Sequence, residues 1–192
     1  WGIGNESWGC GGNFTAQGYA VEYRRFTAWV PSYPGMDHLS FVASGPNDDN
    51  WNWTRGFLEE IVKKGPREVV GIYGLALHYY AWNLSRGKTK DWIEGKGDAV
   101  HFDVTDWYEL LQQGDIMESL IKGHWQVMGE FDREHHIKLV VDEWGPWYKD
   151  GSGLTPTKSL GSPFALSTMR SWIWSAPPRD VIDTTLPLRP SN

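Results

Sequence analysis

The feature that most restricts the possible folds of this chain is a repeat of short apolar segments that alternate with helical patterns. Apolar segments end near residues 6, 44, 80 and 142. Between them, apolar side chains recur at the i, i+3, i+4 spacing of an amphipathic helix, as in Tyr19, Tyr23 and Phe26. Apolar strands that alternate with helices are typical of parallel sheets covered by helices. The sequence therefore predicts an α/β fold with a parallel sheet.

The positions of the elements follow from the apolar residues and from the capping and breaking residues between them. Helices are predicted from Thr15, as the N-cap, to Val30, over 53–64, and over 106–111 and 117–131; strands are predicted over 39–44, 68–80 and 137–141. The segment 81–104 carries glycines and charges without a periodic pattern, which predicts a long loop.

Four strand ends make half of an eight-stranded barrel. A complete (β/α)8 barrel takes about 250 residues, and this chain has 192. We therefore predict that residues 1–150 form part of a (β/α)8 TIM barrel, and that the 192-residue chain alone has little or no activity. A small, complete doubly wound α/β domain is the alternative. Such domains usually bind phosphates through a Gly-rich turn, and no G-x-G-x-x-G motif occurs here.

Residues 151–192 have a different composition from the rest of the chain. Six of the eleven prolines fall between Pro156 and Pro190. This composition predicts a divergent tail. The tail is either a non-native end, from truncation or a shifted reading frame, or a natural segment that has diverged.

Two of the predicted strand ends carry a glutamate. Glu6 stands in Gly4-Asn5-Glu6 after the first apolar segment, and Glu143 stands in Asp142-Glu143-Trp144-Gly145 after the run 139–141. Glycoside hydrolysis uses two carboxyl groups, because one must protonate the leaving oxygen while the other attacks or stabilises the anomeric centre. The pattern therefore indicates a carboxylate pair.

The chain resembles the family 51 glycoside hydrolases in these two motifs and in Trp8-Gly9-Cys10-Gly11-Gly12-Asn13 and Ala43-Ser44-Gly45-Pro46-Asn47. That family comprises α-L-arabinofuranosidases of the retaining (β/α)8-barrel clan, and the resemblance extends from Trp1 to Tyr148. It implies that the four strands are strands four to seven of the barrel. It also implies that Glu6 is the general acid/base and Glu143 the nucleophile, in an enzyme that removes terminal arabinofuranosyl residues by double displacement.

The second motif leaves a choice between two neighbouring acids. Side chains alternate along a strand, so only one of Asp142 and Glu143 is expected to enter the barrel mouth. The resemblance selects Glu143.

The resemblance also implies a set of substrate-binding residues. Asn5 corresponds to the asparagine that hydrogen-bonds the sugar 2-hydroxyl, and Tyr80 to the tyrosine that holds the nucleophile. His78 lies two residues before Tyr80 and so shares its face of the strand, whereas Tyr79 points the other way. For Trp144 and Trp147, core packing is the alternative to a role in the subsite wall. The full set is Asn5, Trp8, His78, Tyr80, Trp144 and Trp147.

Charge and composition narrow the possible partners. A net charge of -6 without a basic stripe argues against nucleic acid or an anionic membrane as a partner. The 13 tryptophans suit stacking on sugar rings. No cofactor is expected, and no metal, because the six histidines form no H-E-x-x-H motif. A half-barrel has open sheet edges, so a second copy of the chain could complete it as a homo-oligomer.

Two alternatives to an arabinofuranosidase stay open. One is a β-glycanase of the same clan, and the other is a non-catalytic carbohydrate-binding fragment. Cys10, the single cysteine, is expected to be a small buried apolar residue beside the site, and it leaves the cellular compartment open.

Overall fold

The computed structural model describes residues 1–31, 34, 39–63, 71–81, 91, 94–149 and 151–152, and the backbone of 181–183. The chain divides into two compact units. The first comprises Trp1–His78, Lys122–Asp142 and Pro177–Asn192, and the second comprises Tyr79–Ile121 and Glu143–Ala176. Among the described residues, no helix is both long and apolar enough to cross a membrane.

The strands form one sheet whose order follows the chain, β1-β2-β3-β4-β5. Their bounds are Gly2–Ile3 for β1, Val42–Ala43 for β2, Gly74–Ala81 for β3, Lys138–Pro146 for β4 and Val181–Asp183 for β5. The pairs β1–β2, β2–β3 and β4–β5 are parallel. A helix lies between β1 and β2, between β2 and β3, and between β3 and β4, so the chain has the β-α repeat that the sequence predicts, and the α/β prediction is confirmed.

The two longest strands are the apolar centre of the sheet. In β3 the residues from Gly74 to Tyr79 are all buried, which explains the unbroken apolar run. In β4 the residues from Leu139 to Val141 are buried, whereas Asp142 is exposed and Glu143 is half-buried. Asp142 and Glu143 are therefore the more exposed positions of β4, between the buried segments 139–141 and 144–146.

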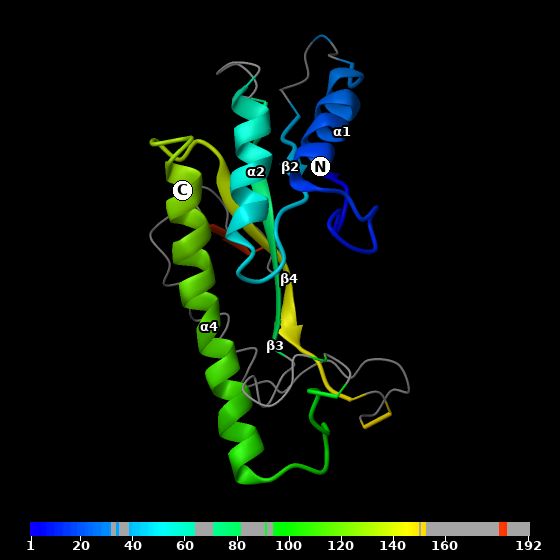
Figure 1. Ribbon diagram of the computed structural model, residues 1–192, viewed down its shortest axis with the longest axis vertical. Helices are drawn as coiled ribbons and strands as arrows, with labels where there is room; N and C mark the ends of the chain where they lie inside the picture. The colour runs from blue at the N-terminus through cyan, green and yellow to red at the C-terminus, as the bar shows by residue number, and fades with distance from the viewer. Residues whose placement is uncertain are drawn as a thin grey trace. The chain divides into compact units, whose positions relative to one another are not determined.

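Two helices of the first unit, α1 (Ala16–Ala28) and α2 (Trp51–Val62), pack side by side (Figure 1). The hydroxyl of Thr15 accepts a hydrogen bond from the Gly18 N–H and caps α1, as predicted. An aromatic cluster joins the helices. The centroid of the Phe57 ring lies 5.6 Å from the centroid of the Tyr19 ring and 5.8 Å from that of the Tyr23 ring.

The third described helix, α4, spans Val104–Gly129 without a break. The sequence predicts two helices here, 106–111 and 117–131, because the segment between them lacks apolar periodicity and contains Gly114. A mid-helix glycine costs about 1 kcal/mol relative to alanine. Burial of Leu110 and Met117 on either side of it offsets this cost. In the second unit, the hydroxyl of Tyr79 donates to the Gln113 carbonyl of α4 at 2.6 Å, so Tyr79 points toward the helix, as alternation predicts.

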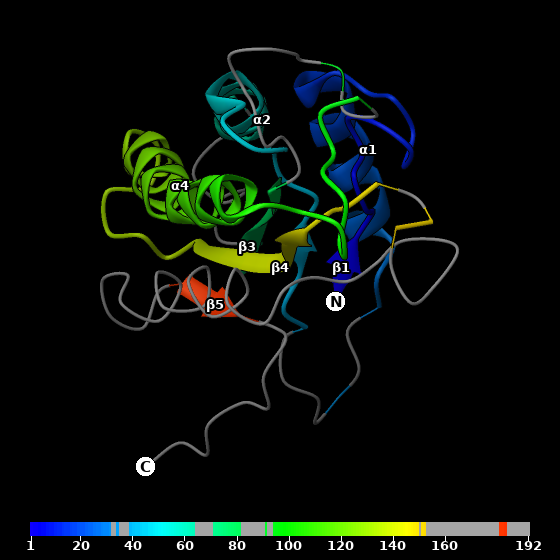
Figure 2. The ribbon, with the colours of Figure 1, turned by 90° about the horizontal axis from the view of Figure 1, so that it is seen from below.

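Two other expectations differ from the structure, and a third lies mostly outside the described residues. The predicted strand 39–44 is reduced to the two residues of β2. Phe26, assigned to the inward face of α1, is 66% exposed, because the buried face of the helix consists of Ala16, Tyr19, Ala20 and Tyr23. Most of the predicted tail, 151–192, lies outside the described residues. Its described strand, β5, continues the sheet beside β4 (Figure 2).

Candidate active site

Glu6 stands in a tight turn directly after β1. Its backbone φ of 41° is in the left-handed region, which a non-glycine residue seldom adopts and which is common where function fixes the chain. The Glu6 carbonyl accepts hydrogen bonds from the N–H groups of Gly9 at 2.8 Å and Gly11 at 3.1 Å. A Cβ on Gly11 would lie 1.6 Å from the Asn5 carbonyl oxygen, so this turn requires glycine there.

A buried hydrogen-bond relay ties this turn to the end of β2. The hydroxyl of Tyr19 donates to the Ile3 carbonyl and accepts from the Ser44 N–H at 2.7 Å. The Ser44 hydroxyl in turn accepts from the N–H of Ser7, the residue after Glu6, at 3.1 Å. Burial raises the pKa of Tyr19, so its hydroxyl stays protonated and able to donate. The relay fixes the backbone on both sides of Glu6.

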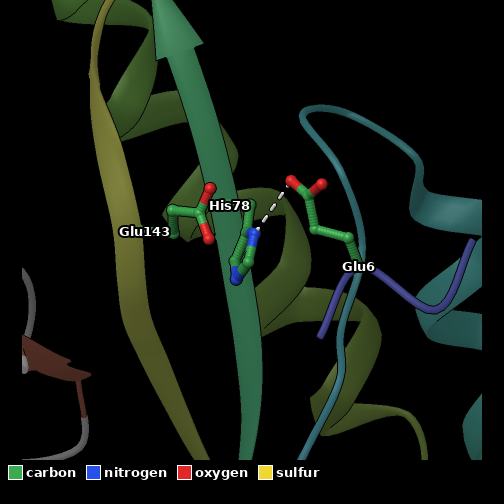
Figure 3. Close-up of side chains that lie close together, drawn as sticks. All are labelled: Glu6, His78 and Glu143. Carbon is green, nitrogen blue, oxygen red and sulfur yellow. Dashed lines mark hydrogen bonds and ion pairs between the residues drawn. The ribbon is translucent and has the colours of Figure 1, made fainter. Parts of the chain in front are cut away.

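The carboxylate of Glu6 points toward β3 (Figure 3). Its Oε1 lies 3.2 Å from Nδ1 of His78, whose side chain is only 6% exposed. The other ring nitrogen of His78, Nε2, lies 3.2 Å from Oδ1 of Asp142. The imidazole thus stands between two carboxylates within the first unit. A neutral imidazole can donate to only one of them, whereas an imidazolium donates to both.

In the second unit, Glu143 has its own hydrogen-bond partner. The hydroxyl of Tyr80 donates to Oε1 of Glu143 at 3.0 Å. The ring of Trp147 lies 4.8 Å from that of Tyr80, and Nζ of Lys96 lies 4.9 Å from the centroid of Trp147. The predicted residues Tyr80, Glu143 and Trp147 are therefore brought together, with Lys96 as an additional neighbour that the sequence did not indicate.

The remaining predicted residues differ in exposure. Asn5 is exposed beside Glu6, and Trp8 is half-buried in the same turn. Trp144 is buried, at 9% exposure, and its position fits core packing better than an open subsite wall. The indole N–H groups of Trp8 and Trp144 are buried and find no hydrogen-bond acceptor within the part of the chain that the structure describes.

Two known proteins are similar to this chain, one in sequence and one in structure. No family model matches the chain. The chain is 34% identical over 152 residues to an intracellular exo-α-L-arabinofuranosidase of Bacteroides ovatus. The aligned residues cover 79% of this chain and 27% of that protein. The crystal structure of the GH51 arabinofuranosidase from Xanthomonas axonopodis pv. citri is similar at a TM-score of 0.66 and 33% identity, over 81% of this chain and 28% of that one.

The resemblance to the family 51 glycoside hydrolases is confirmed. The chain spans about a quarter of the length of these two relatives. Because the family 51 structure is similar over most of this chain, the prediction that the β-α repeat is part of a (β/α)8 barrel is confirmed as well.

The sequence did not indicate two contacts around Glu6 and His78. Asp142 was expected on the face opposite to Glu143, yet its carboxylate lies against His78. Cys10 was expected to be buried; it is exposed, and its Sγ lies 3.2 Å from Oε2 of Glu6. The contact of Cys10 depends on the turn after β1, and that of Asp142 depends on the neighbouring places of β3 and β4 in the sheet. Alternation along a single strand describes neither.

Proposed function

We propose that this chain carries the carboxylate pair of a retaining glycoside hydrolase that removes terminal non-reducing α-L-arabinofuranosyl residues from polysaccharides or oligosaccharides. One observation carries the proposal. Each of the two glutamates in the family motifs contacts a polar side chain of β3, His78 for Glu6 and Tyr80 for Glu143. His78 and Tyr80 are two residues apart, so they share a face of β3.

In the proposed reaction Glu143 is the nucleophile. Its carboxylate attacks the anomeric carbon as the bond to the leaving oxygen breaks, and a covalent arabinosyl-enzyme forms. The Tyr80 hydroxyl, 3.0 Å from Oε1, orients the carboxylate through a hydrogen bond to a charged acceptor. A retaining mechanism requires the two carboxyl groups to be about 5 to 5.5 Å apart in the assembled site.

Glu6 is the proposed general acid and base. In the first step its carboxyl group protonates the leaving oxygen, and in the second step its carboxylate takes a proton from the water that attacks the anomeric carbon. His78 orients the carboxylate through Oε1, and Asp142 orients the imidazole from its other nitrogen. The rigid turn after β1 and the Tyr19 relay hold the Glu6 backbone in place during both steps.

The proposed substrate contacts come from the residues around these two acids. Asn5, exposed next to Glu6, would hydrogen-bond the 2-hydroxyl of the sugar, a contact that strengthens as charge develops at the anomeric carbon. Trp147, half-exposed beside Tyr80, would offer its ring to the sugar. Both similar proteins are arabinofuranosidases, which supports arabinofuranosyl as the sugar.

Two substitutions in the natural protein test the assignment. Glu143→Ala should abolish turnover of every arabinofuranoside, because no covalent intermediate can form. Glu6→Ala should lower kcat/KM by about 100-fold or more for substrates with a poor leaving group, while an activated aryl arabinofuranoside, which needs little protonation, is largely spared. Azide should then accelerate the Glu6→Ala enzyme and give an arabinosyl azide of retained configuration.

The comparison of leaving groups decides the role of Glu6. Equal losses on good and poor leaving groups, with no effect of azide, would show that Glu6 is not the acid. Thermal unfolding of both variants beside the parent serves as the control, because a loss of folding lowers activity on all substrates alike.

A further inference from the structure

The Glu6 carboxylate has two oxygens, and a different side chain lies against each. Oε1 lies 3.2 Å from Nδ1 of His78, and Oε2 lies 3.2 Å from Sγ of Cys10. His78 orients the carboxylate in the proposed reaction, but no role has been given to Cys10. The thiol contacts the oxygen that His78 leaves available for proton transfer.

The turn after β1 fixes this contact. The N–H groups of Gly9 and Gly11, on either side of Cys10, both donate to the Glu6 carbonyl, so the chain folds back over Glu6. The close approach of Gly11 to the Asn5 carbonyl tightens the same turn. Cys10 is consequently held at the position four residues after Glu6, with its side chain over the carboxylate.

We propose that Cys10 is a positioning residue that holds Oε2 of Glu6 in the orientation for proton transfer with the leaving oxygen. This inference rests on the proposed function. A thiol is both a weak donor and a weak acceptor. Cys10 can therefore donate its S–H to the ionised carboxylate and accept a hydrogen bond from the protonated carboxyl group. The double-displacement reaction needs Glu6 in both forms, and a single neighbour that serves both keeps the side chain in one place.

If Cys10 had a purely structural role, its removal would lower the stability of the fold. The positioning role predicts otherwise. Cys10 is exposed, so its side chain fills no core space, and its removal should leave the stability of the fold nearly unchanged. The effect should instead appear in the step that uses proton transfer from Glu6.

The test compares Cys10→Ala and Cys10→Ser in the natural protein on two arabinofuranosides, a 4-nitrophenyl glycoside and an alkyl glycoside. For Cys10→Ala, kcat/KM should fall about fivefold to tenfold on the alkyl glycoside, the size expected for one weak hydrogen bond to a charged group. On the 4-nitrophenyl glycoside it should fall less than about twofold. Cys10→Ser keeps a donor and an acceptor and should restore most of the loss on the alkyl glycoside.

Unchanged kinetics for Cys10→Ala, or equal losses on both substrates, would overturn the inference. Glu6→Ala, measured in parallel, separates this result from failure of the proposed function. If Glu6→Ala shows the leaving-group dependence and Cys10→Ala does not, only the role of Cys10 fails. If the loss of activity in Glu6→Ala does not depend on the leaving group, the proposed function fails.

A second measurement covers the case in which Cys10→Ala is unstable. Methyl methanethiosulfonate converts the thiol of the folded parent protein to a methyl disulfide, which cannot donate, and dithiothreitol reverses the change. Modification of Cys10, verified by peptide mass, should lower turnover of the alkyl glycoside selectively and reversibly. Full activity of the modified protein on this substrate would contradict the proposal.

Discussion

Among single residues, Tyr79 and Tyr80 show how one strand supplies both packing and the site. The hydroxyl of Tyr79 is buried and donates to the Gln113 carbonyl of α4, whereas that of Tyr80 donates to Oε1 of Glu143. The two side chains lie on opposite faces of β3, as period-two alternation requires. They form a natural pair for testing the role of a tyrosine hydroxyl.

We predict that Tyr80→Phe lowers kcat/KM by about 10- to 100-fold, the size expected when a charged group loses one hydrogen bond. The loss should be similar for good and poor leaving groups, because the nucleophile attacks in both cases. Tyr79→Phe is the matched control and should reduce the free energy of unfolding while kcat/KM stays within about twofold of the parent. Steady-state kinetics and urea denaturation of both variants measure this. Full activity of Tyr80→Phe would remove Tyr80 from the site.

For single residues, the sequence predicted the candidate site residues that lie in recognisable motifs. It did not predict the residue that a turn places in contact with Glu6. Glu6 and Glu143 follow apolar runs inside longer motifs, so both could be selected from the sequence. The strand end expected near Glu143 was wrong, because β4 continues to Pro146. The contact of Cys10 with Glu6 depends on a left-handed φ at Glu6 and on two hydrogen bonds to its carbonyl. Neither the glycine pattern nor alternation determines that geometry.

At the scale of elements, α2 and the end of α4 meet at a buried histidine. Nδ1 of His124 lies 2.8 Å from the hydroxyl of Thr54, and Nε2 lies 2.8 Å from the Asp48 carbonyl. Because a carbonyl only accepts, Nε2 carries the proton and Nδ1 accepts from Thr54. Burial lowers the pKa of His124 from 6.5 to about 4, against the smaller opposing effects of the Asp48 carbonyl and Asp49.

This histidine predicts a stability loss in mild acid. Between about pH 6.5 and pH 4 the unfolded chain binds a proton at His124 and the folded chain does not. The stability contribution is therefore complete above pH 6.5 and is lost as the pH falls toward 4, by on the order of 3 kcal/mol. Urea denaturation of the parent and of His124→Gln across this range measures it. In His124→Gln the free energy of unfolding should fall less steeply between pH 6.5 and pH 4 than in the parent. His101→Gln, at a side chain that is 87% exposed, should show the same pH dependence as the parent. Equal slopes for parent and His124→Gln would contradict the assignment.

Element types were predictable from the sequence, but element lengths were not. The helices after Thr15 and before Lys63 follow from capping residues and apolar spacing. The single helix α4 does not, because packing on both sides of Gly114 overrides its low helix propensity. The brevity of β1 and β2 likewise reflects hydrogen bonding across the sheet rather than local composition.

For the whole molecule, the parallel strand order was predictable because each apolar segment is separated from the next by a helix, and such connections place successive strands side by side. The position of β5 beside β4 could not be predicted, because the proline-rich composition around β5 gives no strand signal. Glu6 belongs to one compact unit and Glu143 to the other. The proposed reaction requires the carboxyl groups of both at one anomeric carbon.

The most direct test of that requirement is to identify the residue that becomes covalently attached to the sugar. The natural protein is incubated with an activated 2-deoxy-2-fluoro-α-L-arabinofuranosyl glycoside, which slows hydrolysis of the intermediate, and the labelled peptide is sequenced by mass spectrometry. The account predicts a stable sugar adduct on Glu143, formed slowly in Tyr80→Phe and absent in Glu143→Ala. An adduct on Asp142 or on any other residue, or turnover with inversion at the anomeric carbon, would contradict it.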